Sequence, residues 1–311
     1  MGYIDKMAED FFSYMPPLTK KDDFDQFWCD NLSALQKKPL NLSVEKIDMS
    51  MTHASAFRVY YDGCDDTRIS AWFVTPAFLP QKNLPVMIHY GGSDPLSHGE
   101  LLMTGMCVFI PGMRGHSEEA PDRHTYETGI LRYPTSYGML DRNDSYLKHA
   151  YLDNIRAVDA VCSLPEIDAG SIILEGGSFG GGISLAVAAL DKRPCAAFPN
   201  VPGLCELHEF IKTGIGWAGQ AFREHFARRP EDIDAVLEVL SYFDNMNLAD
   251  KISCPVFAAV GGLDENARPK HFFAAYNRMT CVKDVKIYPF NGHSVLEVHR
   301  RVKMEYIRKI L

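Results

Sequence analysis

The spacing of apolar residues predicts helices at the start of the chain and a hairpin after them. In residues 1–40, apolar side chains recur three and four positions apart, at Phe24, Phe27, Trp28, Leu32 and Leu35. This period is typical of helices that pack one face against a core. Residues 41–75 alternate between apolar and polar positions instead. Within them, the segments 57–61 and 69–74 flank a short polar turn and predict an antiparallel hairpin.

Farther along the chain, short apolar runs alternate with segments of helical period. The runs predict strands at 85–90, 107–111, 172–174, 196–200, 255–262 and 285–290. Helical patterns cover 146–163, 183–190, 269–276 and 294–310. Strands that alternate with crossover helices form a mostly parallel sheet with helices on both faces. The predicted fold class is therefore α/β.

The domain organisation follows from the same pattern. The chain contains no internal repeat, no low-complexity tract and no linker rich in Pro, Gly or Ser. Residues 203–250 form a mostly helical insertion between two predicted strands. We therefore expect a single domain over 1–311, with an N-terminal helical extension at 1–40 and the insertion as a lid-like element.

Residues 172–182 contain the most informative motif of the chain, Ile-Ile-Leu-Glu-Gly-Gly-Ser-Phe-Gly-Gly-Gly. Gly176, Ser178 and Gly180 match the pattern G-x-S-x-G between an apolar run and a helical segment. In a turn from strand to helix, this pattern places the serine in a strained conformation that exposes its hydroxyl. Small residues are needed on either side because strand and helix nearly collide there. The context favours a nucleophilic serine over a plain glycine-rich turn.

A nucleophilic serine needs a base, and the base needs an orienting acid. In hydrolases of this type the chain order is serine, acid, histidine, each beyond the end of a strand. The predicted strand 255–262 leads to Asp264, and the strand 285–290 leads to His293. Glu265 is the alternative acid. His89 and His271 are expected to be structural because they lie inside a predicted strand and a predicted helix. Asp264 and His293 are therefore the predicted partners of the serine.

The oxyanion of ester hydrolysis needs two backbone N–H donors. The residue after the serine, Phe179, supplies one in this motif. The second is expected from Tyr90 or Gly91, where the strand 85–90 ends in a glycine pair. The alternative for this glycine pair is an ordinary turn.

Composition removes several classes of function. A net charge of −8 without a basic run argues against nucleic acid as a partner. No apolar stretch is long enough to span a membrane, and the first ten residues lack the layout of a signal peptide. The eight cysteines are scattered and favour buried thiols in a reducing cytoplasm. Metal-ligand, dinucleotide and Walker patterns are absent from the sequence, so we expect no metal and no cofactor.

Several further segments extend the argument beyond the serine motif. They are 23–28 (Asp-Phe-Asp-Gln-Phe-Trp), 114–115 (Arg-Gly), 157–168, 242–249 and 275–277. Together they resemble the acetyl xylan esterase and cephalosporin C deacetylase family, carbohydrate esterase family seven. The resemblance covers nearly the whole chain, which makes it far more specific than the serine motif alone.

The resemblance implies an α/β-hydrolase fold with Ser178 as nucleophile, Asp264 as orienting acid and His293 as base. The backbone N–H groups of Tyr90 and Phe179 would bind the oxyanion, with Arg114 and Gly91 in supporting roles. Members of the family remove acetyl and other short acyl groups from sugars and small alcohols. The implied substrates are acetylated xylo-oligosaccharides and cephalosporin C. The implied assembly is a ring-like homo-hexamer, in which the hairpin and the 203–250 insertion would be contact and lid elements.

The chain departs from the family pattern at four positions. Phe179, His116 and Ser294 stand where the family has Gln, Gln and Glu, and Arg268 replaces one of a pair of prolines. Phe179 and His116 are expected to change the wall of the acyl or alcohol pocket, and with it the preferred ester.

Other functions remain open at this point. One is a hydrolase of the same fold that acts on a different ester or a thioester. Another is a binding protein of the same fold without catalysis. A prolyl-type peptidase would carry a propeller domain, for which the chain has no space, and a dienelactone-type enzyme would have cysteine in place of Ser178. Covalent labelling of Ser178 by an organophosphorus reagent separates an enzyme from a binding protein.

Overall fold

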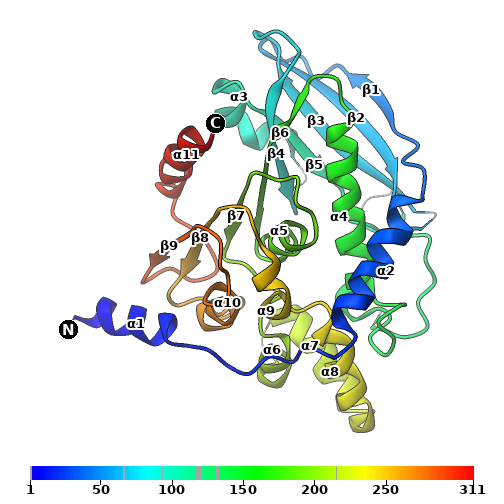
Figure 1. The fold of residues 1–311 in the computed structure, drawn as a ribbon, viewed down its shortest axis with the longest axis vertical. Helices are drawn as coiled ribbons and strands as arrows, with labels where there is room; N and C mark the ends of the chain where they lie inside the picture. The colour runs from blue at the N-terminus through cyan, green and yellow to red at the C-terminus, as the bar shows by residue number, and fades with distance from the viewer. Residues whose placement is uncertain (1, 66, 93, 117–120, 131–132, 215) are drawn as a thin grey trace.

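A single mixed β-sheet forms the centre of the molecule (Figure 1). The computed structural model describes residues 2–65, 67–92, 94–116, 121–130, 133–214 and 216–311. Among these residues the sheet has nine strands. They are β1 (Ser43–Ile47), β2 (Ala54–Asp62), β3 (Arg68–Pro76), β4 (Leu84–Tyr90), β5 (Cys107–Pro111), β6 (Ile167–Gly177), β7 (Ala196–Asn200), β8 (Val256–Gly261) and β9 (Lys283–Tyr288).

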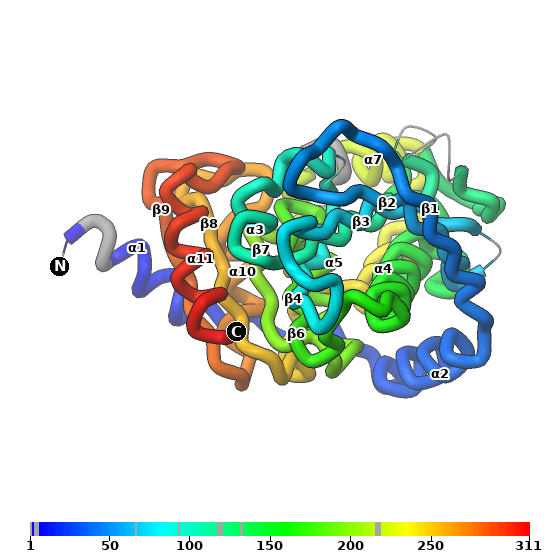
Figure 2. The backbone as a smooth tube through the Cα atoms, turned by 90° about the horizontal axis from the view of Figure 1, so that it is seen from above, coloured from blue at the N-terminus to red at the C-terminus, as the bar shows by residue number. Residues whose placement is uncertain are grey.

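The strand order is β1-β2-β3-β5-β4-β6-β7-β8-β9, and β1 and β9 lie at opposite ends of the sheet (Figures 1 and 2). The pairs β1–β2, β2–β3 and β3–β5 are antiparallel, and the other pairs are parallel. The chain moves from β4 outward to β5 and then returns to β6 on the other side of β4. This reversal creates a crevice at the carboxyl ends of β4 and β6, where α/β proteins bind their ligands.

Helices cover both faces of the sheet. They are α1 (Tyr3–Phe12), α2 (Phe24–Gln36), α3 (Gly99–Met103), α4 (Tyr146–Cys162), α5 (Phe179–Leu190), α6 (Leu207–Thr213), α7 (Gly216–Phe226), α8 (Ile233–Ser241), α9 (Asn245–Leu248), α10 (Pro269–Tyr276) and α11 (His299–Ile310). No helix among the described residues combines the length and the apolar character needed to cross a bilayer.

Two apolar cores lie on either side of the sheet. Along β4, Val86, Ile88 and Tyr90 join the larger core with α4 and α5, whereas Met87 points into the smaller one. The smaller core contains residues of α3 and Ile307 of α11. Side chains that alternate between faces are the expected arrangement of a strand buried on both sides.

Aromatic packing attaches the N-terminal extension to the body. Trp28 of α2 stacks on Tyr151 of α4 with ring centroids 5.9 Å apart, and its indole N–H donates to the carbonyl of Tyr242. Phe11 of α1 stacks on Phe273 of α10 at 5.2 Å. The helical period at the start of the chain therefore reflects real packing against the body.

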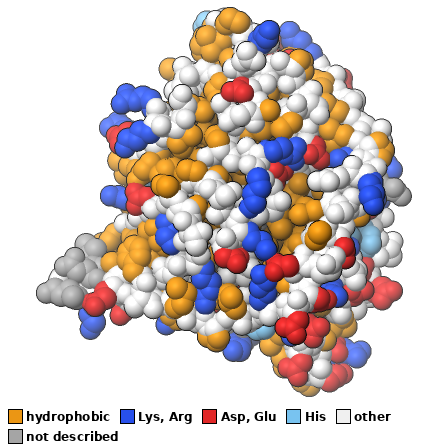
Figure 3. All heavy atoms as spheres, in the orientation of Figure 1, with side chains coloured by type: hydrophobic (Ala, Val, Ile, Leu, Met, Phe, Trp, Pro, Cys, Tyr) orange, Lys and Arg blue, Asp and Glu red, His pale blue; other side chains and the backbone are white. Residues whose placement is uncertain are grey.

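The insertion between β7 and β8 contains α6, α7, α8 and α9, and α6–α8 form the lower end of the molecule in Figure 1. Acidic side chains gather at this end on the face shown in Figure 3. Elsewhere on that face, Lys and Arg are interspersed with acidic and apolar side chains. On this face, acidic side chains are thus densest near the insertion.

Most of the predicted elements are confirmed, including the hairpin (β2–β3), the mostly parallel sheet and the helices around the insertion. Several boundaries were wrong. The strand expected at 285–290 is β9 at 283–288, and the helix expected from residue 183 begins at Phe179. The closing helix was expected from residue 294 but begins at His299, after a bend at Ser294 and a turn at 297–298. Strand β6 begins at Ile167, five residues before the predicted strand. The apolar run marked only the second half of the strand, because the first half is not buried.

Candidate active site

The turn after β6 places Ser178 in a strained conformation. Ser178 has φ +57° and ψ −117°, a region that L-amino acids rarely adopt. Its N–H donates to the carbonyl of Asn200 at 2.9 Å, and its carbonyl accepts from the N–H groups of Gly182 and Gly203. These hydrogen bonds from three directions maintain the strained backbone.

Glycine is required at two positions of this turn. A Cβ on Gly180 would lie 2.1 Å from the carbonyl oxygen of Tyr90, and one on Gly176 would lie 2.4 Å from the carbonyl group of Gly180. Both distances are far shorter than any real contact, and the opposing atoms are backbone. The G-x-S-x-G spacing in the sequence therefore reflects a three-way contact among the end of β4, the end of β6 and the start of α5.

Three side chains converge beyond the strand ends. The Oγ atom of Ser178 lies 2.7 Å from Nε2 of His293, and Nδ1 of His293 lies 2.8 Å from Oδ2 of Asp264. The other carboxylate oxygen of Asp264 accepts from the N–H groups of Asn266 and Ala267, each at 2.9 Å. The alternative acid, Glu265, is exposed. This arrangement allows the imidazole to accept the proton of the serine hydroxyl while the buried carboxylate fixes its orientation.

The predicted oxyanion donors lie beside the serine. Phe179 is the first residue of α5, so its N–H has no acceptor one turn earlier within the helix. Tyr90 ends β4 opposite Gly176, and Gly91, at φ +82°, lies next to Gly180. The helix dipole of α5 adds partial positive charge at the same point. The two predicted donors therefore come from the end of β4 and the start of α5, which touch at Gly180.

An apolar cavity of about 190 Å³ opens at the serine. Ser178, Phe179 and His293 line its base, together with Thr135, Leu147 and His271. The insertion supplies most of the remaining wall, namely Leu204, Cys205, Leu207, Phe210, Ile211, Phe222 and Leu240. Because these side chains are mostly hydrocarbon, the cavity suits an apolar group attached to a reacting carbonyl.

Comparison with known proteins identifies the family. The family model "Acetyl xylan esterase (AXE1)" matches residues 1–310. This chain belongs to the acetyl xylan esterase family. Acetyl esterase Axe7A of Xylanibacter ruminicola is 28% identical over 308 residues, which cover 95% of this chain and 69% of that protein. The predicted family and the predicted ester hydrolase are thereby confirmed.

Solved structures agree with this assignment. The acetyl xylan esterase from Paenibacillus sp. R4 is 35% identical with a TM-score of 0.93, over 97% of this chain and 99% of that chain. Acetyl xylan esterase 1 from Thermoanaerobacterium sp. JW/SL YS485 has a TM-score of 0.89 at 24% identity, over 97% and 98% of the two chains. At 24% identity, the similarity to the Thermoanaerobacterium enzyme shows the fold alone. The predicted α/β-hydrolase fold is confirmed.

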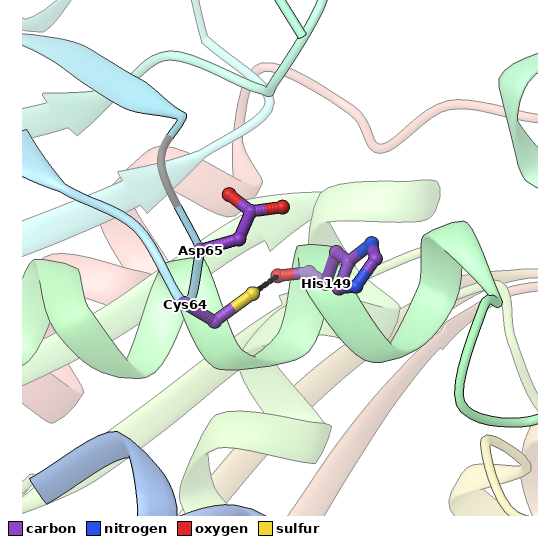
Figure 4. Close-up of side chains that lie close together, drawn as sticks. All are labelled: Cys64, Asp65 and His149. Atoms are coloured by element: carbon purple, nitrogen blue, oxygen red, sulfur yellow. Dashed lines mark hydrogen bonds between the residues drawn. The ribbon is translucent and has the colours of Figure 1, made fainter. Parts of the chain in front are cut away.

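Arg114 lies in a separate ionic cluster of this fold. Its side chain is fully buried, and its guanidinium pairs with Asp153 at 2.7 Å, Asp65 at 3.1 Å and Asp122 at 3.1 Å. Cys64, Asp65 and His149 lie close together beside it (Figure 4). The spacing of these three suits a cation, but the guanidinium already supplies positive charge to Asp65. The cluster therefore joins the β2–β3 turn to α4 as an ion network.

The structure also shows which pocket residues sequence reasoning missed. Phe179 lines the cavity as expected, whereas His116 is exposed, lies near the carbonyl of Arg114 and is not among the lining residues. The expected role of His116 in the pocket wall is therefore not supported by its position. His271 lines the cavity although its helical position suggested a purely structural role. The apolar residues of α6–α8 were visible in the sequence only as a helical insertion.

Four buried histidines predict a loss of stability in acid, and burial beside Arg114 lowers the pKa of one of them, His149, the furthest. Burial, with the neighbouring charges of His89, Arg268 and Lys303 respectively, lowers the pKa of His98, His271 and His299 to about 4. The unfolded chain binds protons at these residues near pH 6.5 and the folded chain does not. The stability that these neutral histidines contribute is complete above about pH 6.5 and is lost as the pH falls toward about 4. For each histidine, the free energy of unfolding falls by up to about 1.4 kcal/mol per pH unit.

Urea unfolding between about pH 7 and about pH 5 measures this slope. His271→Gln removes one titrating group and is expected to reduce the slope by up to about 1.4 kcal/mol per pH unit. An identical slope in this variant would show that His271 does not titrate on unfolding.

Proposed function

We propose that this protein is a serine carboxylesterase that removes acetyl and other short acyl groups from small carbohydrate esters such as acetylated xylo-oligosaccharides. The observation that carries this proposal is the continuous hydrogen-bonded chain Ser178–His293–Asp264 at the base of an apolar cavity. Membership in the acetyl xylan esterase family supports the choice of substrate. The comparisons do not favour a different reaction class.

The proposed reaction has two steps. The Oγ atom of Ser178 attacks the ester carbonyl while Nε2 of His293 accepts its proton, and Asp264 stabilises the imidazolium. The N–H groups of Phe179 and Tyr90 are proposed to bind the oxyanion. His293 then protonates the leaving alcohol, which departs and leaves an acyl-serine. Water, deprotonated by the same histidine, attacks this ester and releases the acid.

The size of the cavity limits the acyl group. An apolar cavity of about 150 Å³ holds one benzene molecule. The cavity at Ser178, about 190 Å³, therefore accommodates a short acyl chain with part of a small alcohol. Residues of α6, α7 and α8 line it, so a chain longer than the cavity would have to displace these side chains.

A series of p-nitrophenyl esters tests this limit. We expect kcat/KM to fall by about tenfold or more between acetate and octanoate, because overpacking a cavity of this size costs about 1–3 kcal/mol. Acetylated xylo-oligosaccharides should release acetate under the same conditions, and cephalosporin C is a second candidate substrate. Activity that rises with chain length would contradict the proposed acyl specificity.

Phe179 is predicted to set the preference between simple and sugar esters. Its half-buried ring lines the cavity, while the reaction requires only its backbone N–H. Phe179→Gln should therefore preserve turnover and shift the ratio of kcat/KM values, p-nitrophenyl acetate to acetylated xylobiose, toward the sugar by about fourfold. The reason is that loss of apolar contact worth about 0.8 kcal/mol per methylene weakens the aryl ester more.

The same substitution at an exposed phenylalanine outside the cavity is the matched control. Phe78 is 52% exposed, so Phe78→Gln should leave the ratio unchanged. An unchanged ratio in Phe179→Gln would remove Phe179 from the specificity determinants and leave the wall of α6–α8 in its place.

Three further properties stay predictions. We propose that residues 1–311 form one domain, that the protein assembles as a homo-oligomer of the hexameric type, and that it acts in the cytoplasm. The packing of α1 and α2 on the body supports the first, the family resemblance supports the second, and the eight free cysteines support the third. Light scattering of the purified protein tests the assembly: a monomeric mass would contradict it.

A further inference from the structure

A buried ionic cluster lies on β6 just before the nucleophile turn. The carboxylate of Glu175 accepts from Nζ of Lys303 at 2.6 Å and from the side-chain amide of Asn200 at 3.3 Å, and its other oxygen lies 3.2 Å from Nδ1 of His89. The side chains of Glu175 and Lys303 are only 4% and 7% exposed. Burial alone would raise the pKa of Glu175, but the charge of Lys303 and the contact with His89 lower that pKa below its usual value. Glu175 is therefore an ionised, fully partnered carboxylate inside the protein.

The members of this cluster are next to the catalytic candidates in the chain. Glu175 is three residues before Ser178, and His89 precedes Tyr90. Asn200 accepts the N–H of Ser178 through its own carbonyl. Lys303 belongs to α11, the helix that follows the His293 segment. The cluster thus joins the three stretches of chain that would supply the oxyanion donor, the nucleophile and the base.

A divalent cation is not the best occupant of this place. His89, His98 and Glu175 have the spacing of metal ligands and line a cavity of about 540 Å³. However, the ammonium of Lys303 already contacts the only carboxylate of the three, and it would repel a dication there. The observations favour an internal ion pair.

The segment that carries His293 is held by the loop after β8 and by contacts where it leads into α11. The carbonyl of Asn291 accepts from the N–H of Leu263 at 2.9 Å, which ties the start of the segment to the loop after β8. Farther on, Leu296 and Val298 are 45% and 51% exposed, so much of the apolar surface of this part stays in water. At its start, Tyr288 bonds to Nδ1 of His299 at 3.0 Å, which closes the segment into a loop. Beyond it, Lys303 connects α11 to Glu175 of β6. The ion pair is therefore a direct link between the base of this loop and the strand that carries Ser178.

We propose that Glu175 and Lys303 are positioning residues that hold the His293 segment over Ser178. This inference rests on the proposed function of Ser178 and His293. The pair touches neither substrate nor reacting atoms and acts through the placement of the imidazole. A displacement of about 1 Å in a catalytic group can lower turnover by about 100-fold, so the link has a measurable consequence.

The test compares Lys303→Met, Glu175→Gln and the wild type with p-nitrophenyl acetate. Lys303→Met retains the aliphatic part of the lysine side chain. Glu175→Gln retains the shape of the glutamate side chain and serves as the test if Lys303→Met does not fold. We expect kcat to fall by about tenfold to 100-fold with KM within about twofold, and labelling by an organophosphorus reagent to slow in parallel.

The matched control is Arg156→Met, which removes a buried cation of α4. This cation pairs with Asp159 and bonds to the carbonyls of Lys38 and Pro39. It should lower the melting temperature and leave kcat unchanged.

The outcomes separate this inference from the proposed function. A fall of kcat in the folded Lys303→Met or Glu175→Gln protein that is absent in Arg156→Met supports the positioning role. A kcat within about twofold of the wild type in both variants, or an equal fall in Arg156→Met, would overturn it. A wild-type protein that neither hydrolyses the ester nor takes the label would overturn the proposed function instead.

Discussion

Replacing Ser178 with alanine is expected to lower kcat for p-nitrophenyl acetate by about three to six orders of magnitude. The hydroxyl that lies 2.7 Å from Nε2 of His293 is the only part of the side chain that is removed. The backbone bonds to Asn200, Gly182 and Gly203 that maintain the strained turn do not involve the side chain. The variant should therefore fold normally, with KM near that of the wild type and a melting temperature within a few degrees.

Ser171→Ala is the control for this variant. Ser171 lies on β6, seven residues before Ser178 in the chain. Its hydroxyl donates to the carboxylate of Asp168 at 2.7 Å. Its activity should equal that of the wild type. Esterase activity that survives in Ser178→Ala at the wild-type level would exclude Ser178 as the nucleophile.

The largest expected loss of stability follows the substitution Arg114→Met. The guanidinium is fully buried and balances Asp65, Asp122 and Asp153, of which Asp153 is itself 4% exposed. Without it, carboxylates remain in the interior without a counter-charge, which costs on the order of 3–5 kcal/mol. We expect the melting temperature to fall by roughly 5–15 °C.

Arg68→Met provides the comparison for Arg114→Met. Arg68 pairs with Asp62 at 2.8 Å, but both side chains are about one-third exposed, so its loss should cost at most about 1 kcal/mol. Equal melting temperatures for the two variants would contradict the structural role of Arg114. An Arg114→Met protein that melts like the wild type but has lost its turnover would place Arg114 in catalysis.

The parts of the fold that the sequence predicted are those fixed by local chemistry. Gly176 is required by its contact with Gly180 four residues later, and both glycines frame Ser178, so the strand, turn and helix were readable from their spacing. The positions of Asp264 and His293 followed from their places after predicted strands, and the structure brings both to Ser178. Chain order was sufficient because parallel strands end at the same edge of the sheet.

Features that depend on distant parts of the chain could not be predicted. Glu175 reads as a polar interruption of an apolar strand, and nothing near it in sequence indicates that Lys303, 128 residues later, neutralises it. The cavity wall formed by α6–α8 could not be predicted either. Its apolar residues indicated helices, but not that these helices would line the cavity at Ser178. The late start of α11 was also missed, because the apolar spacing from residue 294 reads as helix although the helix begins only at His299.

Covalent labelling followed by peptide mapping tests the central claim most directly. The wild-type protein is treated with an organophosphorus reagent, digested and analysed by mass spectrometry, with Ser178→Ala in parallel. The proposed acyl-serine mechanism predicts one stoichiometric label on Ser178, loss of esterase activity in step with labelling, and no label in the variant. A label on another residue, or an active enzyme that takes no label on Ser178, would contradict it.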